Sequence, residues 1–194
     1  MDGFTVTPKE GSPFFVPSYL LDSYPDLELY SGDEINEEGY DFLFSLNRIY
    51  LCEKKAIELL SRREHSSFEL TNKLKQRKFS QSEIDKTLTY LREKNYLNDK
   101  RFTESFILSR LRKKPEGMAM ILQRLLQKGI SYSVSQEIYN NIIDEETKNS
   151  IIQKAYEKSV VKCNGNQEKL INYMQRLGFT YSEVKRIIED NSDY

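Results

Sequence analysis

The sequence predicts an all-α protein in which three tandem three-helix repeats form an elongated array behind a short, irregular or β-like N-terminal segment. Three observations support this fold class. Apolar residues recur at helical spacing almost continuously from about residue 43. Four of the five prolines lie before residue 40. A pattern of about 50 residues also recurs three times, which is typical of helical repeats.

The N-terminal segment differs in composition from the rest of the chain. The stretches GFTVTP and SPFFVPSYL are rich in β-branched and aromatic residues, so we expect them to pair as a small β element. The later stretch YSGDEINEEGYDFL has the form of a turn that enters a helix. Its acidic residues Asp33, Glu34, Glu37 and Glu38 lie where a helix start favours negative charge.

The repeats become visible when FELTNKLKQRKFSQSEIDKTL, AMILQRLLQKGISYSVSQEIY and EKLINYMQRLGFTYSEVKRII are aligned. The offsets between equivalent positions are 51 and then 49 residues. Three apolar columns result, and we expect each to be buried: Leu70, Ile121 and Leu170; Leu74, Leu125 and Met174; Phe79, Ile130 and Phe179. Each stretch predicts a helix, a short turn and a second helix, and a further helix precedes each pair.

We therefore divide the chain into a lead-in, residues 1–42, and three helical repeats at residues 43–97, 98–143 and 144–194. A repeat of about 50 residues is small for an independent core. We expect neighbouring repeats to stack and share their apolar faces.

In the first repeat, Ser66-Ser67-Phe68-Glu69 and Ser80-Gln81-Ser82-Glu83 both match the capping box that opens a helix. Lys78 stands where the other two repeats have glycine. It must therefore adopt a strained left-handed conformation or end the helix in a different way.

In the second repeat, Asn98 or Asp99 can cap the next helix, because a short polar side chain accepts from its free amides. Pro115 fits the first turn of the helix after that.

The turns of the second and third repeats share their chemistry. Gly129 and Gly178 stand where a left-handed residue would end a helix. Thr180-Tyr181-Ser182-Glu183 matches the capping box, and Ser133 with Gln136 is a variant of it in the second repeat.

Bulk composition bounds the class of protein. A content of 30% charged and 38% hydrophobic residues suits a soluble globular protein. Cys52 and Cys163 lie far apart in the sequence, which predicts neither a zinc motif nor a disulfide framework. The N-terminus does not resemble a signal peptide, and no apolar run approaches the roughly 20 residues of a membrane span. We expect a cytoplasmic protein that does not bind a membrane.

The net charge of −1 conceals a strong asymmetry. Residues 1–60 carry 4 Lys and Arg against 12 Asp and Glu, a net of −8. Residues 61–130 carry 17 against 8, a net of +9, and residues 131–194 carry 8 against 10, a net of −2. The middle segment is therefore a candidate docking surface for phosphates or for an acidic protein patch. The alternative is a solvated lysine-rich surface.

The candidate partner-binding residues are cations on neighbouring helices of this middle segment. They are Arg62, Arg63, Lys73, Lys75, Arg77, Lys78, Arg101, Arg110, Arg112, Lys113, Lys114, Arg124 and Lys128. For Arg110, Lys113 and Lys114 the alternative is stabilisation of a helix C-terminus, where the dipole favours cations.

Signatures of catalysis are missing from the sequence. His65 is the one histidine, and it lies beside Glu64 and Ser66 without a candidate nucleophile partner, so we expect a helix cap or a surface residue. No phosphate-binding glycine loop or dinucleotide fingerprint occurs, and the spacing of the carboxylates selects neither a metal site nor an acid–base pair. We expect no enzymatic activity, no metal and no cofactor.

Three stretches resemble successive motifs of the RecX family, the regulatory proteins of the RecA recombinase. They are RREHSSFELTNKLKQRKF, LREKNYLNDKRFTESFILSR and EGMAMILQRLLQKGI. The positions that match the family pattern are Arg63, His65, Ser66, Glu69, Leu70, Leu74, Leu97, Asp99, Arg101, Phe102, Arg110, Gly117, Leu125, Lys128, Gly129 and Ile130. RLGFTYSEV resembles the C-terminal end of the family, so the resemblance covers about residues 45–190.

The sequence departs from the family pattern at several positions. Asn98 replaces an Asp, Thr103 an Ala, Lys78 a Gly and Met118 a Pro. Met120 stands where a basic residue is common, which puts one cationic contact in doubt.

The resemblance implies a non-enzymatic, all-helical protein that binds the RecA filament on single-stranded DNA and restrains strand exchange and ATP hydrolysis. We expect the protein to be a monomer. Direct contact with single- or double-stranded DNA would be weak. One alternative is a stand-alone helical-repeat protein that binds DNA or RNA, which would bind without RecA. Another is a helical adaptor whose middle charges serve solubility.

Overall fold

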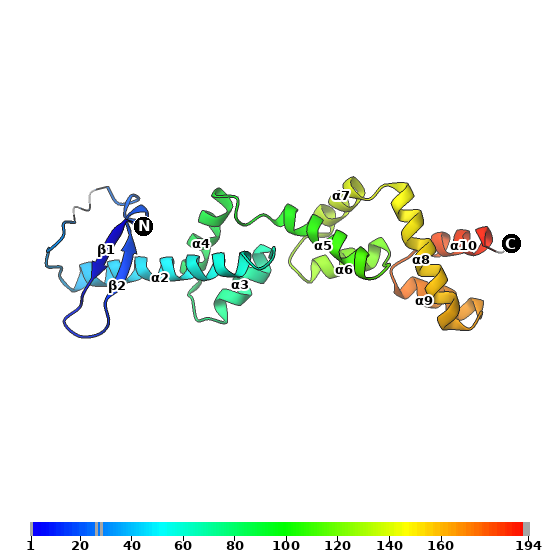
Figure 1. The fold of residues 1–194 in the computed structure, drawn as a ribbon, viewed down its shortest axis with the longest axis horizontal. Helices are drawn as coiled ribbons and strands as arrows, with labels where there is room; N and C mark the ends of the chain where they lie inside the picture. Colours follow the sequence, from blue (N-terminus) through cyan, green and yellow to red (C-terminus); the bar gives the residue numbers. More distant parts are fainter. Residues whose placement is uncertain (1, 26, 28, 192–194) are drawn as a thin grey trace. The chain divides into compact units, whose positions relative to one another are not determined.

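The computed structural model describes residues 2–25, 27 and 29–191. In this part of the chain a two-stranded sheet precedes ten helices, which confirms the all-α class (Figure 1). The chain divides into two compact units. The first consists of Met1–Arg63 and Leu70–Leu97, and the second of Glu64–Glu69 and Asn98–Tyr194.

The N-terminal stretches pair as predicted. Strands β1 (Gly3–Val6) and β2 (Phe14–Pro17) are antiparallel, with Phe4 opposite Val16. Helix α1 (Ser18–Leu21), which the sequence pattern does not predict, follows directly. The hairpin packs on the next helix, so the N-terminal segment shares its core with helical residues.

Helix α2 (Glu37–Leu60) is the longest helix among the described residues, with 24 residues. It begins at Asn36, whose side chain accepts a hydrogen bond from the Gly39 amide at 2.9 Å. Leu43, Leu46 and Ile49 of α2 form a buried cluster with Val6 and Val16 of the hairpin. Helix α2 crosses the boundary between the proposed lead-in and the first repeat at residue 42. The division of the chain into a lead-in and three repeats stays a prediction.

The first unit is completed by α3 (Ser67–Lys75) from Leu70 onward and by α4 (Gln81–Glu93). Leu70 and Leu74 of α3 lie in one apolar cluster with residues of α2 and α4. The two helices are joined by a turn in which Lys78 has a φ of +63°, so this lysine takes the left-handed conformation. The Arg48 Nη2 donates to the Lys78 carbonyl at 3.0 Å and thereby ties this turn to α2.

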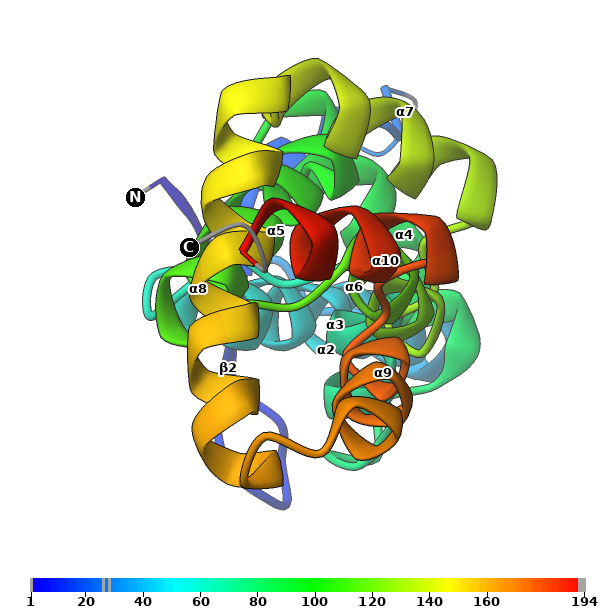
Figure 2. The ribbon, with the colours of Figure 1, turned by 90° about the vertical axis from the view of Figure 1, so that its right-hand side faces the viewer.

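Besides the start of α3, the second unit has six helices and one large apolar cluster within the part of the chain that the structure describes. The helices are α5 (Asp99–Lys113), α6 (Met118–Leu126), α7 (Tyr132–Ile142), α8 (Glu145–Cys163), α9 (Gln167–Arg176) and α10 (Tyr181–Asp190). Figure 2 shows α8 beside α9 and α10, with which it is in contact.

The three aligned apolar columns are core positions. Eight of the nine residues are buried, and Phe79 is partly buried against the same cluster as Leu70 and Leu74. Both bonds of the predicted capping boxes form at Ser80 with Glu83 and at Thr180 with Glu183. Asn98 is confirmed as the cap of α5.

Two local predictions in the second repeat are wrong. The cap of α7 is Ser131, which accepts from the Val134 amide, and not Ser133. Ser131 is equivalent to Ser80 and Thr180 at the repeat offsets, so the alignment contained the correct position. Pro115 lies before α6, which begins at Met118, and therefore does not occupy a first helical turn.

Glycine permits close packing at two equivalent places in the second unit. Gly129 has a φ of +79°, and a β-carbon there would lie 2.4 Å from the Phe68 Cβ. Gly178 has a φ of +94°, and a β-carbon there would lie 2.4 Å from the Met120 amide nitrogen. Each turn therefore seats against the start of an earlier helix, α3 or α6, and has no room for a side chain.

Candidate functional site

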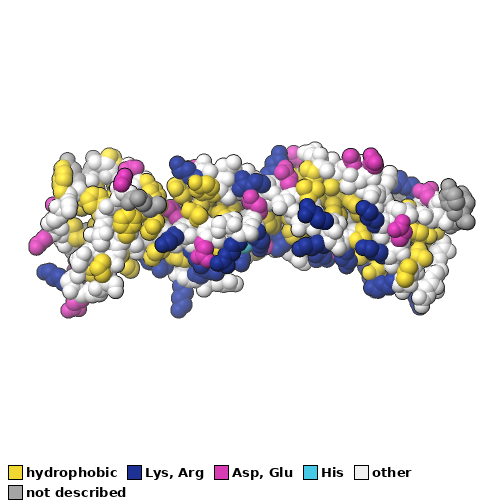
Figure 3. Space-filling model, viewed as in Figure 1, with side chains coloured by type: hydrophobic (Ala, Val, Ile, Leu, Met, Phe, Trp, Pro, Cys, Tyr) yellow, Lys and Arg dark blue, Asp and Glu magenta, His cyan; other side chains and the backbone are white. Residues whose placement is uncertain are grey.

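Cations are abundant on the face of the molecule shown in Figure 3, especially over the region of α5 and α6. The thirteen predicted binding residues fall into both units. Arg62, Arg63, Lys73, Lys75, Arg77 and Lys78 belong to the first unit. Arg101, Arg110, Arg112, Lys113, Lys114, Arg124 and Lys128 belong to the second. The structure separates these residues into cations that hold the fold together and cations that face solvent.

A buried carboxylate binds two of the predicted arginines. Glu116 has no solvent-exposed area, and it lies between α5 and α6 in the sequence. Arg110 donates to it from Nε at 2.9 Å and from Nη2 at 2.8 Å. Arg124 donates from the same two atoms at 3.1 Å each, and the Lys114 Nζ lies 3.9 Å away. We call Arg110, Lys114, Glu116 and Arg124 the Glu116 cluster.

The electrostatics of the Glu116 cluster follow from the two arginines, each of which donates two hydrogen bonds to the same carboxylate. Burial opposes ionisation of Glu116, but the hydrogen bonds from Arg110 and Arg124 outweigh burial and hold the pKa of the carboxyl below its usual value. The same contact raises the pKa of Arg110. Two arginines on one carboxylate leave a net positive charge, and their Nη1 groups are not used by Glu116.

The segment at residues 64–69 binds two more predicted cations. Arg101 Nε lies 2.5 Å from a Glu64 carboxylate oxygen, and Lys128 Nζ lies 2.5 Å from Glu69. The Ser66 hydroxyl donates to the Lys128 carbonyl at 2.7 Å and also accepts from the Glu69 amide. Arg101 and Lys128 therefore hold this segment within the second unit.

His65 is a core residue of the same segment. It is 3% exposed, and its Nδ1 lies 3.4 Å from Glu69. The expectation of a helix cap or surface residue is therefore wrong, because this histidine is buried beside Glu69 and the α3 amide of Glu69 donates to Ser66 instead.

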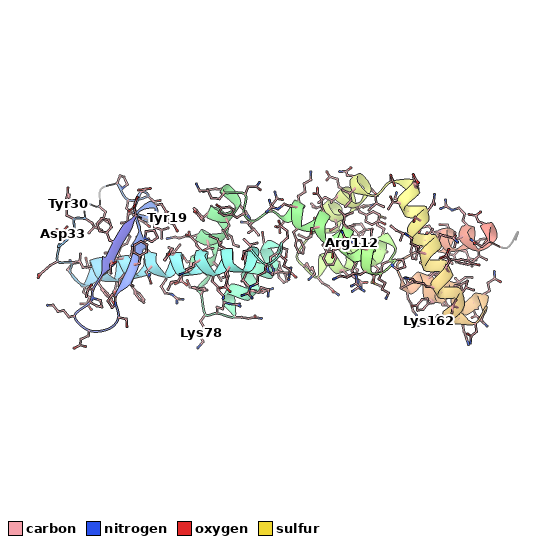
Figure 4. The ribbon with its side chains drawn as sticks, in the orientation of Figure 1. Tyr19, Tyr30, Asp33, Lys78, Arg112 and Lys162 are labelled. Atoms are coloured by element: carbon pink, nitrogen blue, oxygen red, sulfur yellow. The ribbon has the colours of Figure 1, made fainter. Side chains whose placement is uncertain are left out.

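The remaining cations in the first unit lie at the C-terminal end of α3 and in the turn after it. Lys75, Arg77 and Lys78 are exposed, and Lys73 is half-buried. Among the described residues none of the four forms an ion pair with a carboxylate, although Arg77 donates to the Lys73 carbonyl at 2.6 Å. We call these four residues the α3-end cations. Figure 4 shows Lys78 projecting from the turn.

A second exposed pair lies at the end of α5. Arg112 and Lys113 are exposed and form no ion pair with any described carboxylate. Figure 4 marks Arg112 on α5. We call Arg112 and Lys113 the α5-end cations. Both sets lie at helix C-termini, where the dipole stabilises cations by about 0.3–1 kcal/mol and leaves their charge available to a partner.

Of the other first-unit candidates, Arg62 is an exposed residue that pairs with Glu58 at 2.7 Å. Glu58 also accepts from Lys55 at 2.6 Å, and these contacts lower the pKa of its carboxyl. An exposed pair of this kind contributes little to stability and can exchange partners. Arg63 is exposed but interacts with other residues of the protein, so we do not include it among the cations that lack a partner.

Charge counting missed the acidic residues that organise the site. Glu116 was one of eight acidic residues in a segment with net charge +9, and nothing in its local sequence separated it from the others. The signal that could have identified it is its position beside a glycine between two helices that both carry arginine. A second missed residue, Glu53 of α2, is 3% exposed and accepts a hydrogen bond from the Tyr19 hydroxyl.

The structure offers binding chemistry at these surfaces. Within the described part of the chain, no group of three or more His, Cys, Asp or Glu side chains is placed to hold a metal ion. None of the described helices is both long and apolar enough to span a bilayer. Exposed cations that form no ion pair with a described carboxylate suit the binding of an anionic surface.

These features define a class of protein: tandem three-helix domains with cationic helix ends. Comparison with known proteins gives the family. A model described as the RecX first three-helix domain matches residues 52–91, and one described as the RecX second three-helix domain matches residues 98–137. The chain belongs to the RecX family.

Curated relatives agree over most of the chain. A protein of Haemophilus influenzae strain PittEE named "Regulatory protein RecX" is 35% identical over 139 residues, which cover 70% of this chain and 91% of the relative. One of Mannheimia succiniciproducens with the same name is 37% identical over 142 residues, 71% of this chain and 92% of the relative. One of Chlorobium phaeobacteroides, also of that name, is 46% identical over 86 residues, 44% of this chain and 57% of the relative.

Solved structures show the same fold. A crystal structure titled as regulatory protein RecX aligns with a TM-score of 0.80 over 97% of this chain and 94% of that chain, at 19% identity. The crystal structure of RecX from Lactobacillus salivarius aligns with a TM-score of 0.68 over 76% of this chain and 98% of that chain, also at 19% identity.

Proposed function

We propose that this protein regulates a RecA recombinase by binding its filament on single-stranded DNA and inhibiting strand exchange and ATP hydrolysis. Membership of the RecX family and the name that its relatives share support a regulatory role. RecA as the partner follows from the family resemblance. The protein would act in the cytoplasm, as a monomer and without catalysis, in homologous recombination and DNA repair.

We propose one docking surface in each unit: the α3-end cations in the first unit and the α5-end cations in the second. The observation that carries it is that these residues have no carboxylate partner among the described residues, whereas Arg101, Arg110, Arg124 and Lys128 each have one. A cation that forms no internal ion pair breaks none when it binds an anionic surface, although Arg77 would have to release its hydrogen bond to the Lys73 carbonyl. The paired arginines would contribute by keeping the helix ends in place.

This distinction decides which residues should be tested. Reversing the charge of Arg101 or Arg110 would place two carboxylates in contact and disturb folding. Reversing Lys75, Arg77 and Lys78 together alters exposed residues that form no ion pair in the described part of the chain. A matched control reverses Lys158, Lys169 and Arg176, which are also exposed and unpaired there, and gives the same change in net charge.

The experiment measures RecA strand exchange and single-stranded-DNA-dependent ATP hydrolysis at increasing concentrations of the purified protein. We expect the parent protein and the control to inhibit, and the Lys75/Arg77/Lys78→Glu variant to need at least about tenfold more protein, because three charge contacts are lost. Full inhibition by this folded variant would rule out the α3-end cations as the docking surface. No inhibition by the parent protein would rule out the function.

The stand-alone nucleic-acid-binding alternative makes a different prediction for the same surface. Exposed lysines and arginines at helix ends also suit the phosphate backbone. Tight binding to single-stranded DNA without RecA, lost in the Lys75/Arg77/Lys78→Glu variant, would favour this alternative.

A further inference from the structure

Described residues between α1 and α2 line two hollows in the first unit. One hollow of about 470 Å³ lies against the start of α2 and is lined by Ile35, Phe42 and Leu43. A second, of about 410 Å³, lies against the hairpin and α1 and is lined by Phe4 and Leu21. Leu27 and Leu29 line both hollows, so the two adjoin. We call the pair the lead-in groove.

The lead-in groove exposes apolar side chains to solvent. Leu27 is 39% exposed and Tyr24, which packs edge-on against Phe42 at 4.8 Å, is 37% exposed. Tyr30, on the same loop, is 67% exposed. The space-filling view also shows apolar surface, with acidic side chains among it, at the end of the molecule that carries β1 and β2 (Figure 3). Contiguous apolar surface next to polar residues is typical of an interaction site.

The rim of the groove is acidic and lacks cations. Asp33 and Glu34 line the first hollow, and Asp22 lines the second. None of the three forms an ion pair with a described residue, and residues 1–47 contain a single cation, Lys9. One Asp33 oxygen accepts from the Tyr30 amide at 2.7 Å, which holds this carboxylate beside Tyr30 (Figure 4).

We propose that the lead-in groove binds a short basic amphipathic segment of a partner protein. Two adjoining apolar hollows fit large aliphatic or aromatic side chains from one face of such a segment. The uncompensated carboxylates at Asp22, Asp33 and Glu34 would pair with its Lys or Arg residues and would repel an acidic segment or a nucleic acid. The proposal does not depend on the function proposed above, because it concerns different residues of opposite charge.

The test uses the full chain and three synthetic fluorescent peptides of equal length. The first is a helical peptide with leucine on one face and lysine on the other, the second has glutamate in place of lysine, and the third is a scrambled form of the first without an apolar face. Fluorescence anisotropy measures each affinity. We expect the leucine–lysine peptide to bind at least about tenfold more tightly than the other two.

Three variants assign the binding to the groove. Asp33→Lys with Glu34→Lys reverses two of the three rim carboxylates, and Leu27→Ser removes an exposed apolar contact. The control, Asp85→Lys with Glu93→Lys, makes the same charge change on the exposed face of α4. We expect the rim variant to lower the affinity at least about tenfold and Leu27→Ser about threefold, with the control within about twofold of the parent. Circular dichroism verifies that each variant is folded.

Three outcomes would overturn the proposal. The first is equal binding of the leucine–lysine peptide by the parent and the rim variant, and the second is equal affinity for the glutamate peptide. The third is a concentration-dependent dimer in sedimentation that the rim variant abolishes, because the groove would then be occupied by a second copy of this chain.

Discussion

Two buried carboxyl groups, Glu53 and Glu116, show how neighbouring hydrogen-bond donors decide whether burial raises or lowers the pKa of an acid. Burial raises the pKa of Glu53, and the hydrogen bond from the Tyr19 hydroxyl only partly offsets this effect. Glu116 is also buried, but two arginines reverse the balance and lower its pKa. Burial, followed by the contact with Glu53, also raises the pKa of Tyr19. Replacing Glu53 and replacing Glu116 should therefore have different effects on the stability of the protein at neutral pH.

At Glu53, we expect the hydroxyl donor to matter more than the charge of the acceptor. Tyr19→Phe leaves a buried carboxylate without this donor and should lower the free energy of unfolding by about 1–3 kcal/mol. Glu53→Gln keeps an acceptor for the Tyr19 hydroxyl. It also removes a buried carboxyl group whose pKa is raised because burial disfavours its ionised form. It should therefore leave stability at neutral pH equal or higher.

Urea unfolding at pH 7 measures both variants. The control is Tyr30→Phe, which removes the hydroxyl of an exposed tyrosine and should change the free energy of unfolding little. A Glu53→Gln variant that is less stable than Tyr19→Phe would contradict this account of the pair.

At Glu116, the sign of the pH dependence is opposite. A carboxyl whose folded pKa is lowered contributes stability that is present above its unfolded pKa of about 4.3 and is lost as pH falls through the folded pKa. Glu116→Gln should lower the free energy of unfolding at pH 7 by about 1–3 kcal/mol and should reduce the further loss between about pH 5 and pH 3.

Unfolding by urea at several pH values tests this expectation. Glu189→Gln, at an exposed residue paired with Lys185 at 3.6 Å, serves as the control and should retain the acid sensitivity of the parent. An equal loss on acidification in Glu116→Gln and the parent would show that Glu116 is not a principal source of the acid sensitivity.

Single residues also mark the limit of prediction from sequence. The cationic segment is visible in the sequence, because counting charges requires no structure. The partners of those cations are not visible: Arg101 meets Glu64 from 37 positions away, and Lys128 meets Glu69 from 59 positions away. Such contacts depend on packing between helices, so the sequence could not separate the fixed arginines from the exposed α3-end cations.

At the scale of elements, the helix ends were the most predictable features. Capping is a local interaction, and Ser80, Asn98 and Thr180 cap their helices as expected. The error at Ser133 arose because two serines lie two residues apart and both have a polar residue nearby. Helix α1 has only four residues and no periodic pattern, so it could not be predicted.

The seating of the turns in the second unit leads to a prediction about glycine. Gly178→Ala adds both left-handed strain and a close contact with the backbone of Met120, whereas Gly165→Ala adds strain at a φ of +72° in open space. We expect Gly165→Ala to lower the free energy of unfolding by about 1–2 kcal/mol, and Gly178→Ala to lower it by at least about 1 kcal/mol more.

Thermal unfolding of the two variants measures this difference. Gly117→Ala isolates the steric part, because its φ of −71° suits any residue while its β-carbon would lie 2.2 Å from the Gly178 carbonyl oxygen. Equal destabilisation by Gly165→Ala and Gly178→Ala would show that the turn can move away from α6.

At the scale of the whole molecule, the opposing charges of the N-terminal and middle segments remain the dominant feature. If exposed cations dock on an anionic surface, inhibition of RecA should weaken as salt rises, since charges are screened over about 8–10 Å at ordinary ionic strength. We expect the concentration for half-inhibition to rise steadily between about 50 and 200 mM NaCl.

The Lys75/Arg77/Lys78→Glu variant should show a shallower dependence on salt, because it makes fewer charged contacts. This measurement follows RecA ATP hydrolysis, with the Lys158/Lys169/Arg176→Glu variant as its reference. Inhibition that does not respond to salt would exclude electrostatic docking.

The left-handed lysine after α3 also limits how such a chain can lengthen through tandem duplication of its gene. Gly129 and Gly178 lie against an earlier helix because they lack a β-carbon, whereas Lys78 has one and is held by Arg48 of α2 instead. We infer that a module placed upstream and packed as α6 packs on Gly178 would collide with the Lys78 β-carbon, so this packing would need glycine at position 78.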